Sequence, residues 1–530
     1  MNNRKIISLI CIIWQVLLCH IVSGQSSEDW SFSAGGTSSD AGTAIAVDSL
    51  GNIYSAGSFQ GESDFSGHIL TSNGDTDIYL AKYSPQGKLI WVRQAGSNYA
   101  RENTITEYPT AMMVTSKGVY LAGVFSRVGV FGPIKLVSAG GDDVFLARYS
   151  LEGKVEWVVK GGGQSQDIPY DLAVDEDENI YLTGAFQKKA RFGQIFLHAN
   201  NYTDMFLNKY GPNGDLIWAK QSFSKSKVVG KVLEVHERQI YIAGEFSDEL
   251  SLEGKRLKSN GNSDIFLANY SLDGNLNYYK SMGSNGSDEI NQIKMINEYL
   301  YMVGSFQARS NSDNWTSFGG KDAFLQKLNT NGEFVWNKTL GGAGIDVGQS
   351  LGSDSKGNII VVGNFNDQIQ INDSIHFSQG FSDLYLSRFN DQGELDYFET
   401  RGGSNQDHVN RVLVVNDRAL ITGFFTGPQD LRFTSFGASD IFLTSINLSS
   451  HETEMTKLTY VTYPNPSEGE FLIVGNSVIK TIVIYNQSGI MILNDQNVNN
   501  TEHKINLLEM PNGVYVVEIN GSINKKIIIY

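Results

Sequence analysis

Cysteine is almost absent from this chain of 530 residues: the only two, Cys11 and Cys19, lie near the N-terminus. A mature chain that begins beyond them can form no disulfide, thiolate metal site or cysteine nucleophile. Positive charge is also in deficit, with 41 Lys and Arg against 57 Asp and Glu and a formal net charge of −16. Such a chain repels phosphate backbones and anionic lipids at long range, so we expect neither nucleic acid nor a lipid surface as a partner.

Compact catalytic motifs are missing as well. The sequence has no G-x-S-x-G, no H-E-x-x-H and no G-x-x-x-x-G-K-[ST], which are the usual signatures of a nucleophile elbow, a zinc peptidase and a phosphate-binding loop. The eight histidines recur at no common position. We therefore predict no catalytic residue, no metal ligand and no cofactor, with Ca²⁺ as an open alternative, and we favour a protein that is not an enzyme.

Long apolar runs are limited to the N-terminus, where residues 1–24 have the pattern of a signal peptide. Arg4 and Lys5 precede an apolar run from Ile6 to Leu18, and a small-residue cleavage site ends at Gly24. The run is too short to span a bilayer comfortably. We predict a chain that is exported through the periplasm, is secreted or held at the outer-membrane surface, and has no transmembrane segment once the leader is removed.

Proline is scarce, with 9 residues, whereas 55 glycines separate short runs of β-branched and aromatic residues, which is typical of β-strands joined by turns. One such run ends in phenylalanine and recurs seven times at intervals of 59 to 66 residues. A run that opens with aspartate follows each copy, and a glycine turn then leads to a Trp or Tyr strand in six copies. Each unit therefore contains four strands. The recurring phenylalanines are Phe59, Phe125, Phe186, Phe246, Phe306, Phe365 and Phe425.

Four-stranded units that repeat radially form a β-propeller, in which neighbouring blades bury each other's faces. The seventh unit lacks its fourth strand, and a matching piece that contains Trp30 precedes the first unit. This permutation closes a ring and removes free sheet edges. We predict an all-β fold: a seven-bladed β-propeller over residues 25–446, with the N-terminal strand in the last blade, and a small C-terminal β-sandwich.

The repeating unit resembles the SBBP-type β-propeller repeat of bacterial extracellular proteins. The matching features are G-N-I-Y-x-x-G-x-F, G-x-x-D-[IV]-[FY]-L-x-[KR]-Y and W-x-x-x-x-G-G, and they cover residues 28–446. The resemblance implies the fold and export, and it implies no particular reaction.

The C-terminal tail is similar to the type A sorting domain of type IX secretion cargo, which is known from Bacteroidota. The resemblance implies that residues 460–530 form an Ig-like sandwich recognised by the type IX secretion machinery, with later removal of the tail and attachment to the surface. Residues 447–459 are polar and aperiodic, so we predict a linker there in which cleavage occurs. The matching residues are Pro464, Asn465, Pro466, Gly469, Gly489, Gly513, Tyr515, Lys525 and Lys526.

Aspartates follow the repeat more regularly than any other polar residue. One set opens the third strand of all seven units, from Asp77 to Asp440, and a second set precedes the first strand of five units, from Asp40 to Asp407. Alternating strand direction places both sets near one face of the disc, where they could hold cations or bind sugar hydroxyls. We favour a structural role, in which each carboxylate accepts backbone N–H bonds in its own turn. The acidic residues 175–179 lack the glycine of a calcium loop, so we interpret them as a hairpin turn.

Departures from the repeat are better candidates for a ligand site, because a single site breaks the symmetry. Extra residues join the first unit to the second and include Tyr99, Arg101 and Tyr108, and a long loop of the fifth unit carries Arg309 and Trp315. We expect both loops on the aspartate-bearing face. Aromatic and arginine side chains suit a glycan or a peptide, so these five residues are our predicted ligand contacts.

The leading hypothesis is a monomeric, non-enzymatic surface or secreted protein that binds a glycan or a protein. The alternative is an extracellular polysaccharide hydrolase or lyase with acidic residues on the propeller face or in the central channel, and a third possibility is a purely structural or adhesive component. Convergent carboxylates with shifted pKa values in a deep pocket favour the enzyme. A shallow face with exposed aromatic residues favours binding.

Overall fold

The computed structural model describes residues 29–530 except 98–106, 308–314, 316, 372–373, 428–434, 436, 452–459, 466, 488 and 522. The predicted signal peptide therefore lies outside the described residues. β-Strands dominate the described part, whose one helical element is a short 3-10 turn, and this confirms the all-β prediction. In the same part of the chain, no helix has the length and hydrophobicity needed to cross a lipid bilayer.

The first repeat shows how the sequence forms one unit. Its strands β2 (Ala41–Val47), β3 (Ile53–Phe65), β4 (His68–Tyr83) and β5 (Leu89–Ser97) pair antiparallel in chain order. Asp48 closes the turn between β2 and β3 by accepting the N–H groups of Leu50 and Asn52 at 3.0 and 2.9 Å. Gly51 has a φ of +80° in this turn, a conformation that glycine adopts without strain. We call each such four-stranded unit a blade and number the blades in chain order.

Six further groups of four paired strands follow within the described residues. Blade 2 contains β6 (Tyr108–Thr115), β7 (Gly118–Phe131), β8 (Ile134–Tyr149) and β9 (Val155–Gly163), and blade 3 contains β10 (Ile168–Val174), β11 (Ile180–Phe192), β12 (Ile195–Tyr210) and β13 (Leu216–Gln221). Blade 4 contains β15 (Val228–His236), β16 (Gln239–Phe246), β19 (Asp264–Ser271) and β20 (Leu276–Met282), and blade 5 contains β21 (Glu289–Ile296), β22 (Tyr299–Phe306), β23 (Asp322–Asn329) and β24 (Phe334–Leu340). Blade 6 contains β25 (Asp346–Ser353), β26 (Ile359–Phe365), β29 (Asp383–Phe389) and β30 (Leu395–Arg401), and blade 7 contains β31 (Asp407–Val415), β32 (Arg418–Phe425), β33 (Asp440–Asn447) and the N-terminal β1 (Trp30–Gly36). Short accessory strands are β14 (Phe223–Ser224), β17 (Glu249–Leu252), β18 (Lys255–Lys258), β27 (Gln368–Ile371) and β28 (Ser374–Phe377).

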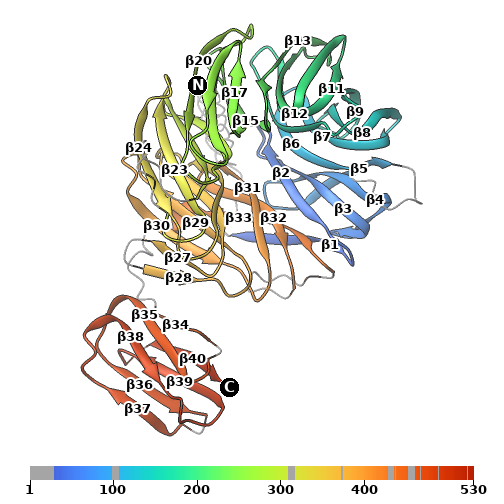
Figure 1. The fold of residues 1–530 in the computed structure, drawn as a ribbon. Helices are drawn as coiled ribbons and strands as arrows, with labels where there is room; N and C mark the ends of the chain where they lie inside the picture. Colours follow the sequence, from blue (N-terminus) through green and yellow to red (C-terminus); the bar gives the residue numbers. More distant parts are fainter. Residues whose placement is uncertain are drawn as a thin grey trace, which may run out of the picture.

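The two ends of the propeller meet in blade 7. Strand β1 pairs with β33, with Trp30 opposite Ser445 and Ala34 opposite Ile441, so the N-terminal strand completes the blade that contains Asp440, as predicted. The first strands of successive blades contact one another around the axis, and β31 of blade 7 contacts β2 of blade 1. The blades therefore form a closed ring (Figure 1).

The core of the propeller lies between the blades. Each buried cluster combines side chains from two neighbouring blades: Tyr54 and Trp91 of blade 1, for example, share a cluster with Phe131 and Phe145 of blade 2. The last two rings lie 4.8 Å apart. Full burial of such a side chain contributes roughly 1.5–3 kcal/mol. A single four-stranded sheet has no partner of its own for its two faces, so the blades are stable only as neighbours.

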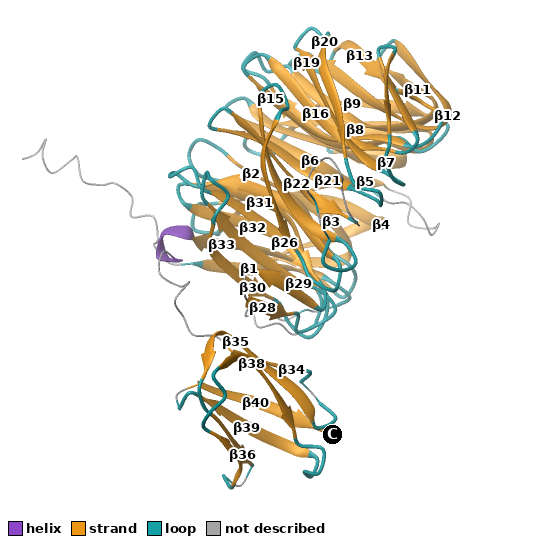
Figure 2. Cartoon of the chain, turned by 60° about the vertical axis from the view of Figure 1, so that its left-hand side comes forward, coloured by secondary structure: helices purple, strands orange, loops and turns teal. Residues whose placement is uncertain are grey.

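The C-terminal residues form a separate sandwich of two sheets (Figure 2). One sheet contains β34 (Tyr460–Tyr463), β35 (Glu470–Ile479) and β38 (Asn500–Asn506), and the other contains β37 (Met491–Asp495), β36 (Ile482–Asn486), β39 (Gly513–Ile519) and β40 (Ile523–Ile529). Phe471, Ile484 and Val517 are buried in a core that belongs to the sandwich alone. Tyr463 contacts the propeller, where its ring stacks on Phe377 at 4.3 Å.

The propeller extends further along the chain than predicted. Asn447 is the last residue of β33, and Leu448–His451 form the 3-10 turn η1. Leu448 is buried, donates its N–H to the Asp417 carbonyl at 2.8 Å, and accepts a bond from Arg388 at 3.1 Å. Because this anchored leucine packs on blade 7, residues 447–451 belong to the propeller and not to the predicted linker, whose remaining residues lie outside the described part of the chain.

Candidate functional site

The predicted ligand contacts do not converge on one described surface. Tyr99, Arg101 and Arg309 lie outside the described residues. Tyr108 is the first residue of β6 and is half-buried, and burial raises the pKa of its hydroxyl to about 12. The prediction for Trp315 is wrong: its side chain has no exposed surface and belongs to the core between blades 4 and 5.

Trp315 takes the place of a phenylalanine found in other blades. It stacks on Phe324 of the third strand with ring centroids 4.6 Å apart, as Phe131 packs on Phe145 at 4.8 Å in blade 2. The ring therefore fills a core position that Phe65, Phe131 and Phe192 fill in blades 1 to 3. The signal available in the sequence was the aromatic residue upstream of the third strand in these units, and the unusual loop of the fifth unit obscured it.

The two aspartate sets meet at the junctions between blades. Asp143 accepts the N–H of Ala139 at 2.7 Å, and Asp167 accepts the N–H of Gly163 at 2.7 Å. Burial raises the pKa of Asp143 to about 6 and that of Asp167 to about 7. Backbone donors hold these carboxylates, which supports the structural interpretation of the rim. In blade 2 the equivalent residue is Glu107, which the aspartate pattern missed.

The acidic run at 175–179 forms the turn between β10 and β11. Asp175 accepts the N–H groups of Asp177 and Asn179 at 3.0 and 2.8 Å, and Glu178 has a φ of +61°. The hydroxyl of Tyr181 also donates to Asp175 at 3.0 Å. These bonds confirm the prediction of a hairpin turn.

The junction between blades 4 and 5 departs from this regular scheme. On the aspartate-bearing face it contains a polar cavity of about 310 Å³. The cavity lies where the loop before β19 runs beside the loop before β21, and the N–H of Asp288 donates to the Ser263 carbonyl at 2.9 Å. Its lining residues are Lys227, Glu245, Ser247, Asn262, Ser263, Ser287, Asp288 and Glu289.

Two ion pairs border this cavity. Lys231 Nζ lies 2.8 Å from Glu245 Oε1, and Lys321 Nζ lies 2.7 Å from Glu289 Oε1. Burial alone would raise the pKa of Glu289, but the bond from Lys321 and the charges of the neighbouring lysines lower it below its usual value. Glu289 is therefore ionised at neutral pH and offers a fixed acceptor.

Lys227 adds a positive charge to the cavity wall. Its side chain is exposed, and its charge helps to lower the pKa of Glu289. In the other six blades the aligned position, which lies directly before the first strand or opens it, holds an acid. The acids are Asp40, Glu107, Asp167, Asp288, Asp346 and Asp407.

Glu245 and Glu289 also break the repeat. The position of Glu245, before the recurring phenylalanine, is uncharged in the other blades, where it holds Ser58, Val124, Ala185, Ser305, Asn364 and Phe424. The position of Glu289 holds Ala41, Tyr108, Ile168, Val228, Val347 and His408. Because these are single replacements inside aligned strands, a search for insertions missed them. A position-by-position alignment of the repeats would have found them.

The cavity wall contains both hydrogen-bond donors and hydrogen-bond acceptors. Its ammonium, amide and hydroxyl groups donate hydrogen bonds, and its carboxylates accept them. None of the lining residues is a histidine or a cysteine. The arrangement therefore suits a ligand that carries many hydroxyl groups.

The first strand of each blade carries a β-bulge at one common position along the central axis. Asn291 and Asn410 at this position donate to inner-strand carbonyls of the next blade, those of Gly348 and Gly42, at 2.9 and 2.7 Å. All seven bulged residues are polar, so the ring around the axis is polar. They are Thr43, Thr110, Tyr170, Lys231, Asn291, Gln349 and Asn410.

Charged groups join opposite sides of the ring further along the axis. Arg411 Nη2 of blade 7 lies 3.5 Å from Asp171 Oδ1 of blade 3, although the two blades are not neighbours. Asp171 also accepts the N–H of Leu233 at 3.0 Å. Burial raises the pKa of Asp171 and that of nearby Glu234, while the charge of Lys294 acts in the opposite direction on both.

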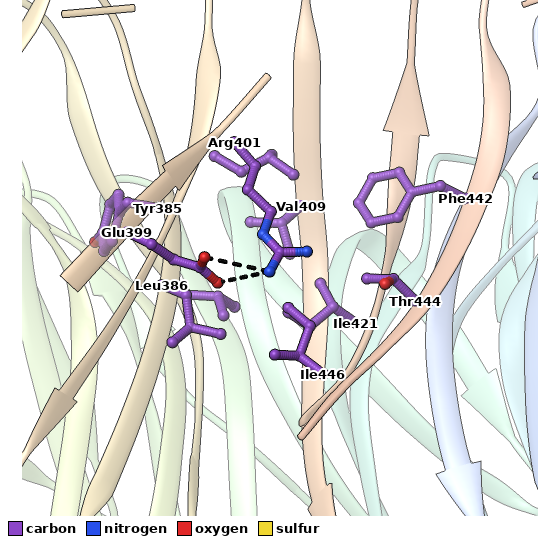
Figure 3. A pocket seen from close by; sticks show the side chains of 11 residues that line it. Tyr385, Leu386, Glu399, Arg401, Val409, Ile421, Phe442, Thr444 and Ile446 are labelled. Atoms are coloured by element: carbon purple, nitrogen blue, oxygen red, sulfur yellow. Dashed lines mark hydrogen bonds and ion pairs between the residues drawn. The ribbon is translucent and has the colours of Figure 1, made fainter. Parts of the chain in front are cut away.

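An apolar pocket lies between blades 6 and 7 (Figure 3). Glu399 and Arg401 of β30 point toward each other beside it, with a nitrogen-to-oxygen distance of 3.0 Å. The free space is only about 30 Å³, enough for about one or two water molecules. We interpret it as a packing gap and not as a ligand site.

The predicted sorting residues hold the C-terminal sandwich together. The amide of Asn465 donates to the Lys526 carbonyl at 2.8 Å and accepts the N–H of Ile528 at 2.9 Å, so it pairs with the edge of β40 as a short strand would. The hydroxyl of Tyr515 donates to the Pro511 carbonyl at 2.6 Å. Pro464 directly precedes Asn465, and Pro466 lies outside the described residues.

The glycines and lysines of the same motif also have defined places. Gly469 has a φ of +106°, and a β-carbon there would lie 2.8 Å from the backbone of Leu508. Gly489 has a φ of +75° in the turn before β37. Gly513 starts β39, while Lys525 and Lys526 lie in β40 next to it. The motif thus specifies the turns and the last strand pair of the sandwich.

Comparison with known families agrees with this geometry. Residues 461–530 match the family model described as a secretion system C-terminal sorting domain, and residues 161–185 match the model described as a β-propeller repeat. The tail is a secretion-system sorting domain. The sorting domain indicates export by the type IX secretion system to the cell surface or the extracellular space, and recognition by that machinery.

Two curated proteins are similar to this chain. The regulatory protein FlaEY of Caulobacter vibrioides is 25% identical over 345 residues, which are 58% of this chain and 34% of that protein. An uncharacterised WD repeat-containing protein of Acanthamoeba polyphaga mimivirus is 20% identical over 426 residues, which are 71% of this chain and 28% of that protein. The chain thus spans about a third or less of the length of these relatives.

Solved structures that match this chain include plexin A4 and a Synechocystis apocarotenoid oxygenase. The plexin extracellular region has a TM-score of 0.43 and 8% identity, and the match covers 92% of this chain and 60% of that one. The oxygenase has a TM-score of 0.36 and 8% identity, with 90% of this chain and 96% of that chain covered.

Proposed function

We propose that the exported propeller is a non-enzymatic binding module that holds a glycan in the polar cavity between blades 4 and 5. The observation that carries this proposal is the concentration of Lys227, Glu245 and Glu289 at one junction of an otherwise repetitive ring. Sugar hydroxyls donate and accept hydrogen bonds at once, and this cavity wall contains both kinds of partner. A protein that inserts a polar side chain is the competing ligand.

The sorting domain supports export of the propeller to the cell surface or the extracellular space, where it would meet such a ligand. We propose that residues 1–24 are removed during export, that the chain between residues 451 and 460 is cleaved, and that the monomeric propeller acts at the surface or after release. Residues 460–530 would then serve transport only. Retention of the uncleaved tail on the mature surface protein would contradict this division of roles.

A glycan array probed with the full exported chain tests the binding proposal. We expect Lys227→Ala to weaken glycan binding about ten- to a hundredfold, because a hydrogen bond from a charged donor contributes about 1.5–3 kcal/mol. Glu245→Gln should weaken it as well. The matched control is Lys258→Ala, which removes an exposed lysine from β18 beside the same blade. Equal binding by the Lys227 and Lys258 variants would reject the cavity as the site, and capture of a protein with no glycan signal would favour the competing ligand.

The alternative function is a polysaccharide hydrolase or lyase that uses the central axis. It is supported by Asp171 and Glu234, two carboxyl groups whose pKa values burial raises and which lie near each other. The Arg411 ion pair and the Leu233 N–H occupy Asp171, which favours a structural role for this group. Release of reducing or unsaturated sugar ends by the wild type, and not by Asp171→Asn, would establish the enzyme.

A further inference from the structure

Two neighbouring turns meet at the end of the central axis opposite the glycan cavity. Glu237 lies in the turn between β15 and β16, directly after His236, and Glu298 lies in the turn between β21 and β22. His236 Nε2 is 3.9 Å from Glu298 Oε1. One ligand atom from each of the three residues falls within 4.8 Å of the others. Chain positions about sixty residues apart thus present one imidazole and two carboxylates to a common point.

The Nε2 atom of His236 is free of hydrogen bonds to the described residues and faces Glu298 at 3.9 Å. The atom itself is shielded from solvent, although 33% of the side chain is exposed. A shielded polar atom is rarely left without a partner in a native structure. The equivalent positions in the other two-residue turns hold Thr115, Ile296 and Val415, so the histidine is particular to blade 4.

An acidic cavity lies beside these residues. It has a volume of about 300 Å³ and is lined by Asp175, Glu176 and Asp177 together with His236 and Glu237, against one arginine, Arg238. The acidic run of the third blade, which closes a hairpin, therefore also contributes negative charge here. A concave surface with an excess of one charge attracts ions of the opposite sign, and here these are cations.

We propose that His236, Glu237 and Glu298 bind a divalent transition-metal ion of the Zn²⁺ class. Imidazole together with carboxylates suits Zn²⁺, Co²⁺ or Ni²⁺, whereas Ca²⁺ and Mg²⁺ prefer oxygen ligands alone. Zn–N and Zn–O bonds are about 2.0–2.2 Å long, so small side-chain rotations bring the three ligand atoms onto one ion. Three protein ligands leave an open position, which water or an oxygen ligand can fill.

Metal titration of the full exported chain tests the site. The probes are Zn²⁺ by calorimetry and Co²⁺ by its visible absorption, with Ca²⁺ in a parallel titration. We expect His236→Ala to abolish the Co²⁺ signal and Glu298→Gln to weaken binding by more than about tenfold, since loss of an outer partner alone has an effect of this size. The control is His198→Ala, which removes an exposed histidine from β12.

The two variants together distinguish loss of metal binding from loss of folding. Glu298 is an exposed turn residue, so its variant should fold even if the His236 variant does not, and thermal melting verifies this. Unchanged Co²⁺ binding in both variants, or binding of Ca²⁺ in preference to Zn²⁺, overturns the proposal. Loss of glycan binding on the opposite face is not expected in either variant.

Discussion

The carboxyl pair of Asp322 and Asp346, between blades 5 and 6, tests how protonation of a buried acid affects the free energy of unfolding. Asp346 is fully buried beside Asp322 and accepts the N–H of Gly342 at 2.7 Å. Burial, reinforced by the charge of Asp322, raises the pKa of Asp346 to about 8. At neutral pH Asp346 therefore holds a proton that it can donate to Asp322. The Asp346→Asn variant keeps this geometry, because its amide can donate to Asp322 and accept from Gly342 without any titration.

The expected effect follows from the direction of the shift. The pKa of Asp346 is higher in the folded protein than its ordinary value of 3.8. The stabilisation from its protonated form is therefore complete below about pH 4 and is lost as the pH rises toward about 8. A group in this range changes the free energy of unfolding by about 1.4 kcal/mol per pH unit. We expect Asp346→Asn to gain stability over the wild type by up to about this amount per pH unit between about pH 4 and 8, and the difference to level off above that.

Urea unfolding followed by tryptophan fluorescence at several pH values measures this difference. Asp215→Asn provides the control, because Asp215 is an exposed turn residue and should leave the pH profile unchanged. Parallel profiles for Asp346→Asn and the wild type would refute the reasoning, since they would mean that Asp346 is already ionised in the folded ring at neutral pH.

Three further perturbations test the packing, the tail and the closure of the ring. Trp315→Ala should lower the free energy of unfolding by about 3–5 kcal/mol, because it empties a fully buried site; a thermal melt that matches the wild type would place the ring at the surface instead. Asn465→Ala removes two hydrogen bonds to β40 and should destabilise the sorting domain by about 1–3 kcal/mol, with faster proteolysis of the last strand; an unchanged proteolysis rate would mean that these two bonds do not stabilise β40. Deletion of residues 29–36 leaves the edge of β33 unpaired and should cause association through that edge; a monomer by size-exclusion chromatography, with unaltered melting, would contradict closure by β1.

The architecture could be predicted because it depends on local and periodic features. The phenylalanines from Phe59 to Phe425 mark equivalent strands, and the recurring β-branched and aromatic runs of the described repeats form strands. The missing last strand and its counterpart at Trp30 predicted how the chain ends pair. The Asn465 motif likewise predicted the sorting domain, because its residues match the pattern of a known family.

Packing between blades alone decided which side chains are buried and which residues, distant in sequence, lie next to one another. The sequence suggested that Trp315 is an exposed loop residue, yet its ring is buried in the core and stacks on Phe324. Lys227 and Glu289 are separated along the chain and border one cavity, as His236 and Glu298 border another. The reason is physical: strand propensity acts over a few residues, whereas a site forms where two blades place their turns side by side, and that placement exists only once the ring has closed.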